Sequence, residues 1–165
     1  MSLSIVTGLG PRTGTSFIMA AAHKAGLPVH GERFISGVTV EKHNPDGYWE
    51  TVQLSDTLDN CVVKLWSPVL CTVPQSKVGS VVVLERKNKL QQLQSMYKVF
   101  KDECKLNSLF LSFPDPSEVM TYVMELTEEW LSKQQQSKIM RIYTEDINDN
   151  LSDVLRFLQK GISWQ

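Results

Sequence analysis

The chain has 165 residues, which is enough for one domain built around a single hydrophobic core. Its residues are 42% hydrophobic and 21% charged, as in an ordinary globular protein, and their formal charges sum to −1. This balance argues against nucleic-acid or membrane-surface binding driven by bulk charge, although a few local cations are enough to bind a small anion.

Short apolar runs alternate with helical patterns along the chain, and this alternation predicts an α/β fold. Most runs are continuously apolar, as in SVVVLE at 80–85, which is typical of strands buried on both faces of a parallel sheet. We therefore expect residues 1–165 to form a single doubly wound domain, with about five mainly parallel strands and helices on both faces of the sheet. The predicted strands are residues 4–7, 61–66, 80–84, 108–113 and 138–143.

The first predicted strand leads into the glycine-rich turn GLGPRTGTSF at residues 8–17. A helix over residues 16–25 follows, and Gly26 and Pro28 end it. The next segment, residues 30–54, is polar and rich in turn residues, and it fits neither a helix nor a strand pattern. We interpret it as a functional loop or lid.

Three more helices are predicted in the second half of the chain. Apolar residues recur at helical spacing over 88–105, over 115–131 and over 151–158, where Gly161 ends the last helix. The second of these helices has Asp115 as its N-cap and Pro116 at its first position. The residues expected on the buried faces are Leu90, Leu93, Met96, Tyr97, Phe100 and Cys104 in the first, and Val119, Tyr122, Val123, Leu126 and Trp130 in the second.

The cysteines and the N-terminus bear on the cellular compartment. Cys61, Cys71 and Cys104 are odd in number and show no paired spacing, so we expect neither a disulfide framework nor a metal site. The N-terminus lacks a basic region followed by a long apolar run, so no signal peptide is expected. No apolar run approaches the length of about 18 residues that spans a membrane. We expect a cytoplasmic protein without membrane or nucleic-acid partners.

The glycine-rich turn is predicted to bind an anion. Because it follows a strand and opens a helix, its backbone N–H groups converge, and the helix N-terminus adds a positive partial charge. A guanidinium in the turn can add two parallel hydrogen bonds to the anion. The residues expected to form this site are Gly10, Arg12, Thr13, Gly14, Thr15 and Ser16.

The turn differs from the nucleotide-triphosphate loop G-x-x-x-x-G-K-[ST]. Thr15 stands where the lysine should be, and Leu9 replaces the first glycine. Glu85, at the end of a later strand, is the residue that would lie near magnesium in such a site. A P-loop nucleotide kinase or hydrolase is therefore one alternative, and the missing lysine counts against it.

The turn PRTGTSF resembles the 5′-phosphosulfate-binding loop of the sulfotransferases, P-[KR]-[ST]-G-[ST]-[ST]-[FWL], in which the cation stands two residues before the glycine. Arg12 matches that cation. Four further segments are similar to family motifs in the family's order, namely HNPDGYWE, VVKLWSP, VVVLERKNKLQQLQS and RIYTEDI. The resemblance implies a P-loop NTPase-like fold and 3′-phosphoadenylyl sulfate (PAPS) as the sulfuryl donor, with the bisphosphate PAP as product and no metal.

The resemblance also implies the residues that hold the donor. The backbone of residues 12–16 would cradle the 5′-phosphosulfate, and Arg12 would stabilise charge on the bridging oxygen of the leaving group. Arg86 and Ser95 would bind the 3′-phosphate. Ser95 lies nine residues after Arg86, where the family usually has eight, and one residue rotates a helix by about 100°.

The catalytic positions depart further from the family. In its motif K-x-H-x-P, Lys64 matches the lysine, but Trp66 stands at the position of the histidine. Glu50 and His43, in the polar segment, are the candidates for a general base. The same segment is the expected contact surface for the acceptor.

The leading prediction is sulfuryl transfer to a hydroxyl or amine of a small-molecule or carbohydrate acceptor. A non-catalytic module that binds PAP or another anion is the main alternative, and Trp66 favours it. The C-terminal LQKGISWQ favours it too, because Lys160, Gly161 and Trp164 retain little of the family's late loop over the nucleotide. We expect the nucleotide to be less enclosed and more weakly bound.

Overall fold

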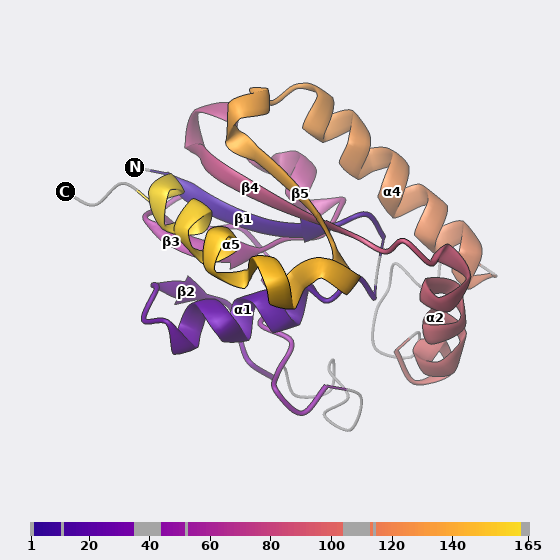
Figure 1. The fold of residues 1–165 in the computed structure, drawn as a ribbon. Helices are drawn as coiled ribbons and strands as arrows, with labels where there is room; N and C mark the ends of the chain where they lie inside the picture. Colours follow the sequence, from indigo (N-terminus) through magenta and orange to yellow (C-terminus); the bar gives the residue numbers. More distant parts are fainter. Residues whose placement is uncertain are drawn as a thin grey trace.

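The computed structural model describes residues 2–10, 12–34, 44–51, 53–103, 113 and 115–162, and it describes side chains in helix α2 only as far as Lys98. A parallel sheet forms the centre, with its strands in the order β2-β3-β1-β4-β5 (Figure 1). The strands are β1 (Leu3–Gly8), β2 (Val29–His30), β3 (Cys61–Lys64), β4 (Val78–Glu85) and β5 (Ile139–Tyr143). The predicted doubly wound α/β fold is confirmed.

Helices cover both faces of this sheet. Helices α1 and α5 lie on one face and α4 lies on the other, while α2 lies near the carboxyl ends of the strands, against the N-terminal part of α4 (Figure 1). The helices are α1 (Thr15–Lys24), α2 (Lys89–Glu103), α4 (Pro116–Ser132) and α5 (Ile147–Gly161), and the short 3₁₀ helices are η2 (Val69–Thr72), η3 (Gln75–Lys77), η4 (Gln136–Lys138) and η5 (Thr144–Asp146). Among the described residues, no helix combines the length and the apolar character needed to cross a bilayer.

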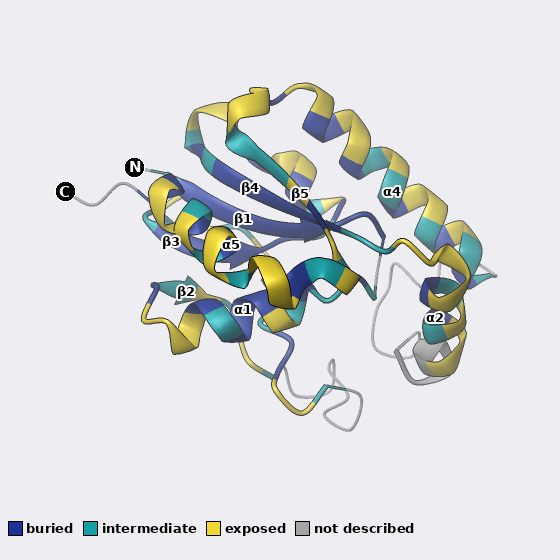
Figure 2. Ribbon diagram, in the orientation of Figure 1, coloured by how far each residue is buried: buried dark blue, intermediate teal, exposed yellow. Residues whose placement is uncertain are grey.

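The two faces of the sheet bury two separate hydrophobic cores. In β4, Val81 and Val83 face the α4 side with Trp130, whereas Val82 faces the other side with Ile18. This division follows from the period of two in a strand, and it explains why consecutive residues of β4, as in Val81–Leu84, are apolar. The central strands β1, β3 and β4 are accordingly buried, whereas β5 at the edge is partly exposed and the outer sides of the helices are exposed (Figure 2).

The strand predictions hold for β1, β3, β4 and β5. Strand β3 ends at Lys64, two residues before the predicted end. Strand β2 was missed, because it has only two residues and includes the exposed His30. The predicted strand at 108–113 lies outside the described residues except for Phe113, which is not part of a strand.

The buried faces of two helices were predicted only in part. Met96, Val119, Val123 and Trp130 are buried as expected. Three expected core residues are instead exposed, with exposed fractions of 65% for Leu90, 51% for Tyr97 and 37% for Tyr122. Leu93 and Leu126 are half-buried, and the side chains of Phe100 and Cys104 lie outside the described set.

A polar contact explains the different face of α2. Gln92 is fully buried, and its Nε2 donates a hydrogen bond to the carbonyl oxygen of Leu9 at 3.0 Å. With Gln92 and Met96 turned inward, Leu90 and Tyr97 face outward, because they lie on another side of the helix. The Tyr97 hydroxyl lies 2.8 Å from Asp115 Oδ2.

The ends of α4 and α5 agree with the sequence. Asp115 caps α4, because its Oδ1 accepts a hydrogen bond from the Ser117 backbone N–H at 2.7 Å, and Pro116 is the first helical residue. Gly161 is the last residue of α5, and a Cβ there would lie 2.2 Å from Ser80 Oγ and 2.5 Å from Ser4 Oγ. This glycine therefore lets α5 approach the sheet closely.

Candidate functional site

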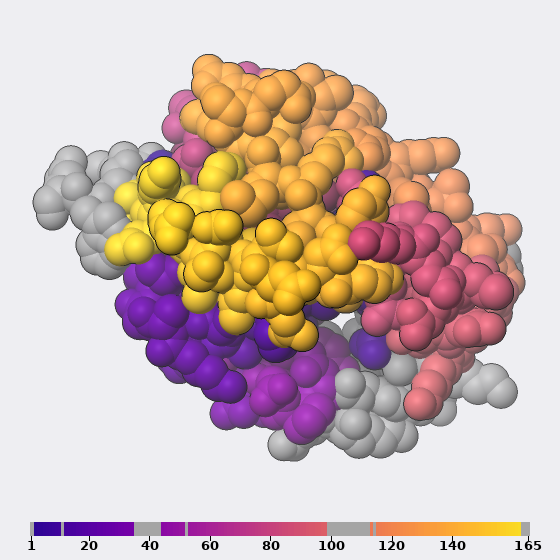
Figure 3. Space-filling model, in the orientation of Figure 1, coloured from indigo at the N-terminus to yellow at the C-terminus, as the bar shows by residue number. Residues whose placement is uncertain are grey.

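The candidate site lies at the carboxyl edge of the sheet, where β1 and β4 end side by side. The turn after β1 is tied to β4 through the Leu9 backbone N–H, which donates to the Leu84 carbonyl oxygen at 2.8 Å. In open α/β sheets, this edge is where ligands bind. Atoms of the first part of the chain, drawn in indigo, are visible at the surface between α2 and α5 (Figure 3).

The turn has a strained backbone. Gly10, Arg12 and Gly14 have φ angles of 80°, 66° and 87°, and a left-handed conformation is uncommon for a residue such as arginine. Gly14 is also the N-cap of α1, and no side chain caps that end. Left-handed residues next to a helix N-terminus aim backbone N–H groups at a common point, and such a concavity binds anions.

Glycine is required in the turn for packing as well as for conformation. A Cβ on Gly10 would lie 2.9 Å from Met120 Cγ and 3.1 Å from Gln92 Nε2. The absence of a side chain therefore lets α4 and α2 close directly onto the turn. Thr13 is fully buried beneath the turn, with its hydroxyl 3.3 Å from the Gly10 carbonyl oxygen.

Arg12 and Ser95 meet although 83 residues separate them. Arg12 Nε donates a hydrogen bond to Ser95 Oγ at 3.1 Å. The extra residue between Arg86 and Ser95 therefore does not turn this serine away from the loop. Arg12 and Ser95, which the sequence predicts to bind the same nucleotide, therefore contact each other.

Arg86 follows β4 directly and is half-buried. Its Nε is buried without a hydrogen-bond partner. Glu145 lies close enough for the charge of Arg86 to act on its pKa. Burial raises the Glu145 pKa, but backbone hydrogen bonds, including those from Lys87 and Asn88, and the charge of Arg86 together outweigh burial. The Glu145 pKa is therefore lowered. No hydrogen bond is described between Arg86 and either Arg12 or Ser95, so the structure brings these three only to the same edge of the sheet.

Lys64 is the buried cation of the site. Its side chain is 1% exposed, and Nζ lies 2.7 Å from Glu50 Oε1 and 3.1 Å from Ser16 Oγ. The third acceptor is the carbonyl oxygen of Tyr48. An ammonium group has three N–H donors, so these contacts use all of them and fix the lysine between the first turn of α1 and residues 48–50.

The position of Trp66 changes the chemistry near Lys64. The Lys64 ammonium lies 6.0 Å from the centre of the Trp66 ring and 5.9 Å from that of Tyr48, which is cation–π range. The indole offers no base where the sulfotransferase motif has histidine. Glu50 is the nearby carboxylate, and its side chain is 22% exposed. His43 lies outside the described residues.

Thr144 is a site residue that the sequence analysis did not identify. Its hydroxyl lies 2.6 Å from the Thr13 carbonyl oxygen and 2.9 Å from that of Glu85. The residue therefore joins the glycine-rich turn at residues 8–17, called the anion turn below for its proposed ligand, to the end of β4. In the sequence, the sign of this role is that a residue with a hydroxyl group directly follows the last strand, at the edge of the sheet where the strands end.

Comparisons with family models, with curated proteins and with solved structures found no significant match. What the site can do therefore follows from its own geometry and from its sequence motifs. Left-handed backbone next to a helix N-terminus, together with Arg12, suits an anion, and Glu50 is a carboxylate that can serve as a base. Among the described residues, no three His, Cys, Asp or Glu side chains gather into a metal site.

Proposed function

We propose that the protein binds PAPS at the 8–16 turn and transfers its sulfuryl group to a hydroxyl or amine. The observation that supports this most directly is the hydrogen bond between Arg12 and Ser95. It joins the segment that resembles the 5′-phosphosulfate loop to the segment that resembles the 3′-phosphate site. The buried, unpartnered Nε of Arg86 adds a donor that suits a phosphate at the same edge.

PAPS would supply a sulfuryl group attached to a good leaving group. The protein would position the two substrates and neutralise the charge that develops during transfer. Residues 12–16 would hold the 5′ group through backbone N–H groups, and Arg12 would offset the negative charge that grows on the leaving oxygen. The acceptor oxygen or nitrogen would form the new bond to sulfur as the bond from sulfur to the leaving oxygen breaks. Glu50 would take the acceptor's proton, since Oε2 is not engaged by the ion pair that Oε1 makes with Lys64.

A non-catalytic PAP-binding module is the second candidate, and the geometry of Lys64 favours it. All three donors of this lysine are used inside the protein, so it can contact a donor molecule only after rearrangement. With Trp66 beside it in place of histidine, the only described proton acceptor next to it is an ion-paired carboxylate. Binding without transfer would then be the function.

Thermal-shift titration tests whether PAP binds. A ligand that binds only the native state raises the melting temperature by mass action. We expect PAP to stabilise more than AMP, and ATP to give no magnesium-dependent shift. A larger shift with ATP and magnesium than with PAP would overturn the proposal in favour of a P-loop kinase or hydrolase.

The Arg86→Ala variant tests the 3′-phosphate role. It should weaken PAP binding by about tenfold or more, in keeping with one charge-assisted hydrogen bond, and leave AMP binding nearly unchanged. Arg156→Ala is the matched control, since Arg156 is exposed on α5 and pairs with Asp153. Equal weakening of PAP and AMP by Arg86→Ala would remove this residue from the 3′-phosphate role.

Transfer of labelled sulfate separates the enzyme from the binding module. With PAPS and a panel of hydroxyl and amine acceptors, the wild type should form a sulfated product, and Glu50→Gln should reduce the rate by about a hundredfold or more while PAP still binds. PAP binding without transfer to any acceptor would support the binding module.

A further inference from the structure

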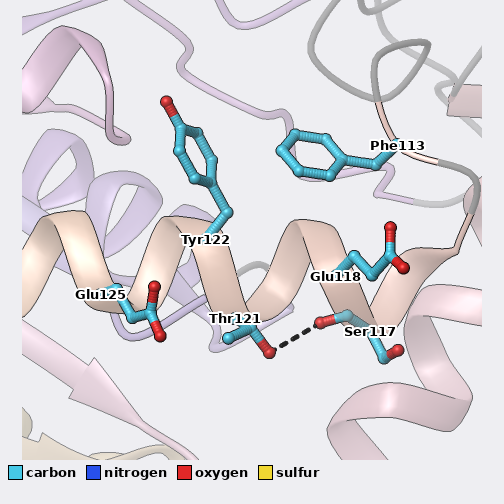
Figure 4. Close-up of a pocket in the computed structure, with 6 residues that line it drawn as sticks. All are labelled: Phe113, Ser117, Glu118, Thr121, Tyr122 and Glu125. Carbon is cyan, nitrogen blue, oxygen red and sulfur yellow. Dashed lines mark hydrogen bonds between the residues drawn. The ribbon is translucent and has the colours of Figure 1, made fainter.

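The outer side of α4 carries a groove that is separate from the anion turn. It has a volume of about 380 Å³ and is lined by Phe113, Ser117, Glu118, Thr121, Tyr122 and Glu125 (Figure 4). Met120, which packs toward Gly10, lies on another side of the same helix. At 3.6 residues per turn, Glu118, Tyr122 and Glu125 share one stripe, about 160° around the helix from Met120.

The floor of the groove is aromatic. The rings of Phe113 and Tyr122 lie 5.2 Å apart between centres at an interplanar angle of 41°, and both stand on the same side of α4 (Figure 4). Tyr122 is 37% exposed, although its position in the sequence predicts burial. An apolar surface of this kind can bind an aliphatic side chain or the face of a cationic group.

Two free carboxylates flank this floor. Glu118 and Glu125 are exposed, and neither side chain forms an ion pair or hydrogen bond with any described residue. The other glutamates nearby on α4 differ, because Glu128 pairs with Arg141 and Glu129 pairs with Lys133. Among the residues whose side chains are described, none neutralises the negative charge that these two carboxylates bring to the groove.

The spacing of the carboxylates indicates the shape of the partner. Seven residues separate Glu118 from Glu125, which is two helical turns or about 10 Å along α4. A helix with basic residues at positions i and i+7 has the same spacing, and an aliphatic residue between them would meet the Tyr122 ring. We propose that this groove binds a basic amphipathic helix of a partner protein, by charge complementarity around an apolar centre. This inference does not depend on the proposed transferase activity.

A designed probe tests the proposal. It is a labelled, alanine-based peptide of about 18 residues, long enough to form a helix, with lysines at i and i+7 and leucines at i+3 and i+4. Its control has the same composition, with the lysines moved off the face of the leucines. Fluorescence anisotropy should show that the protein binds the first peptide at least about fivefold more tightly, and that salt weakens the binding.

The variant Glu118→Gln/Glu125→Gln should weaken this binding by about fivefold or more. Its matched control, Glu129→Gln/Asp153→Asn, makes the same charge change at exposed positions outside the groove and should bind like the wild type. Equal binding of the two peptides, no binding of either, or equal weakening by both variants would overturn the proposal. Self-association in sedimentation that Glu118→Gln/Glu125→Gln abolishes would also overturn it, because a second copy of the chain would then occupy the groove.

Discussion

At the scale of single residues, the pair of Lys64 and Glu50 combines a buried cation with a partly exposed anion. Lys64 is 1% exposed and Glu50 is 22% exposed. Removing one partner of a buried pair leaves the other charge without compensation, and this costs more than removing both. Removing Glu50 alone should therefore destabilise the protein more than removing both residues.

We predict that Glu50→Ala lowers the free energy of unfolding by about 3 kcal/mol, because the Lys64 charge stays buried. The double variant Lys64→Met/Glu50→Ala should regain at least about 1 kcal/mol of this loss, since methionine fills the space without a charge. Urea denaturation measures both values. Lys133→Met/Glu129→Ala, which removes an exposed pair, is the control and should have little effect. A double variant less stable than Glu50→Ala would contradict the prediction.

Cys61 gives a pH-dependent prediction. Burial of the thiol, together with the nearby charge of Asp59, raises the Cys61 pKa from 9.0 to about 11. Below pH 9 the thiol is protonated in both states, whereas above pH 9 the unfolded chain loses the proton first. The free energy of unfolding therefore falls as the pH rises from about 9 to about 11. The expected decrease is about 3 kcal/mol, since each unit of pKa difference corresponds to about 1.4 kcal/mol.

The comparison of the wild type with Cys61→Ala isolates this effect from other groups that titrate at high pH. The variant should be less stable than the wild type at about pH 8, because it leaves a small cavity, and the difference should shrink as the pH rises to about 10.5. Unfolding in urea at several pH values measures the difference. A difference that is constant with pH would contradict the raised pKa.

At the scale of elements, Thr144 connects the start of η5 to the anion turn. Thr144→Val keeps the side-chain shape but removes the donor that lies near the Thr13 and Glu85 carbonyl oxygens. We predict a loss of about 1 kcal/mol in unfolding free energy, the cost of losing a hydrogen bond to partly buried carbonyl groups. PAP and AMP should bind more weakly by the same factor, because under the proposed function the turn would hold the 5′ group that both share.

Thr72→Val is the matched control for this substitution. The Thr72 hydroxyl donates to the Val69 carbonyl oxygen in η2, on the exposed surface and away from the turn. It should leave both nucleotide affinities unchanged in a thermal-shift or calorimetric titration. If Thr144→Val weakens PAP but not AMP, Thr144 acts on the 3′ side of the ligand and its assigned role is wrong.

The elements show where sequence patterns are sufficient and where they fail. Continuous apolar runs identified the buried strands, and capping residues identified the start of α4, because these features depend on nearby residues alone. The face of α2 could not be predicted in the same way. Gln92 is buried through a hydrogen bond to Leu9, a contact across 83 positions that leaves no periodic pattern. For the same reason, the contact of Ser95 with Arg12 and the role of Thr144 became visible only in three dimensions.

At the scale of the whole molecule, the fold gathers distant segments at one edge of the sheet. The end of β3 contacts residues 48–50 and the start of α1 through Lys64, and the turn after β1 contacts the middle of α2 through Arg12 and Ser95. A parallel sheet makes this possible, since all of its strands end on the same side. A ligand at this edge would contact several segments at once and slow their opening together.

Amide hydrogen exchange tests this coupling with two nucleotides that differ in one phosphate. AMP should protect backbone amides in residues 12–17 only, because under the proposed function the turn would hold the 5′ group. PAP should protect the same amides and also those in residues 86–95, where Arg86 and Ser95 would contact the 3′-phosphate. The amides of the buried strand β4 exchange slowly in any case and serve as an internal reference. Protection of 86–95 by both nucleotides would show that the helix responds to the 5′ group through Arg12, and the separate 3′-phosphate site would then be wrong.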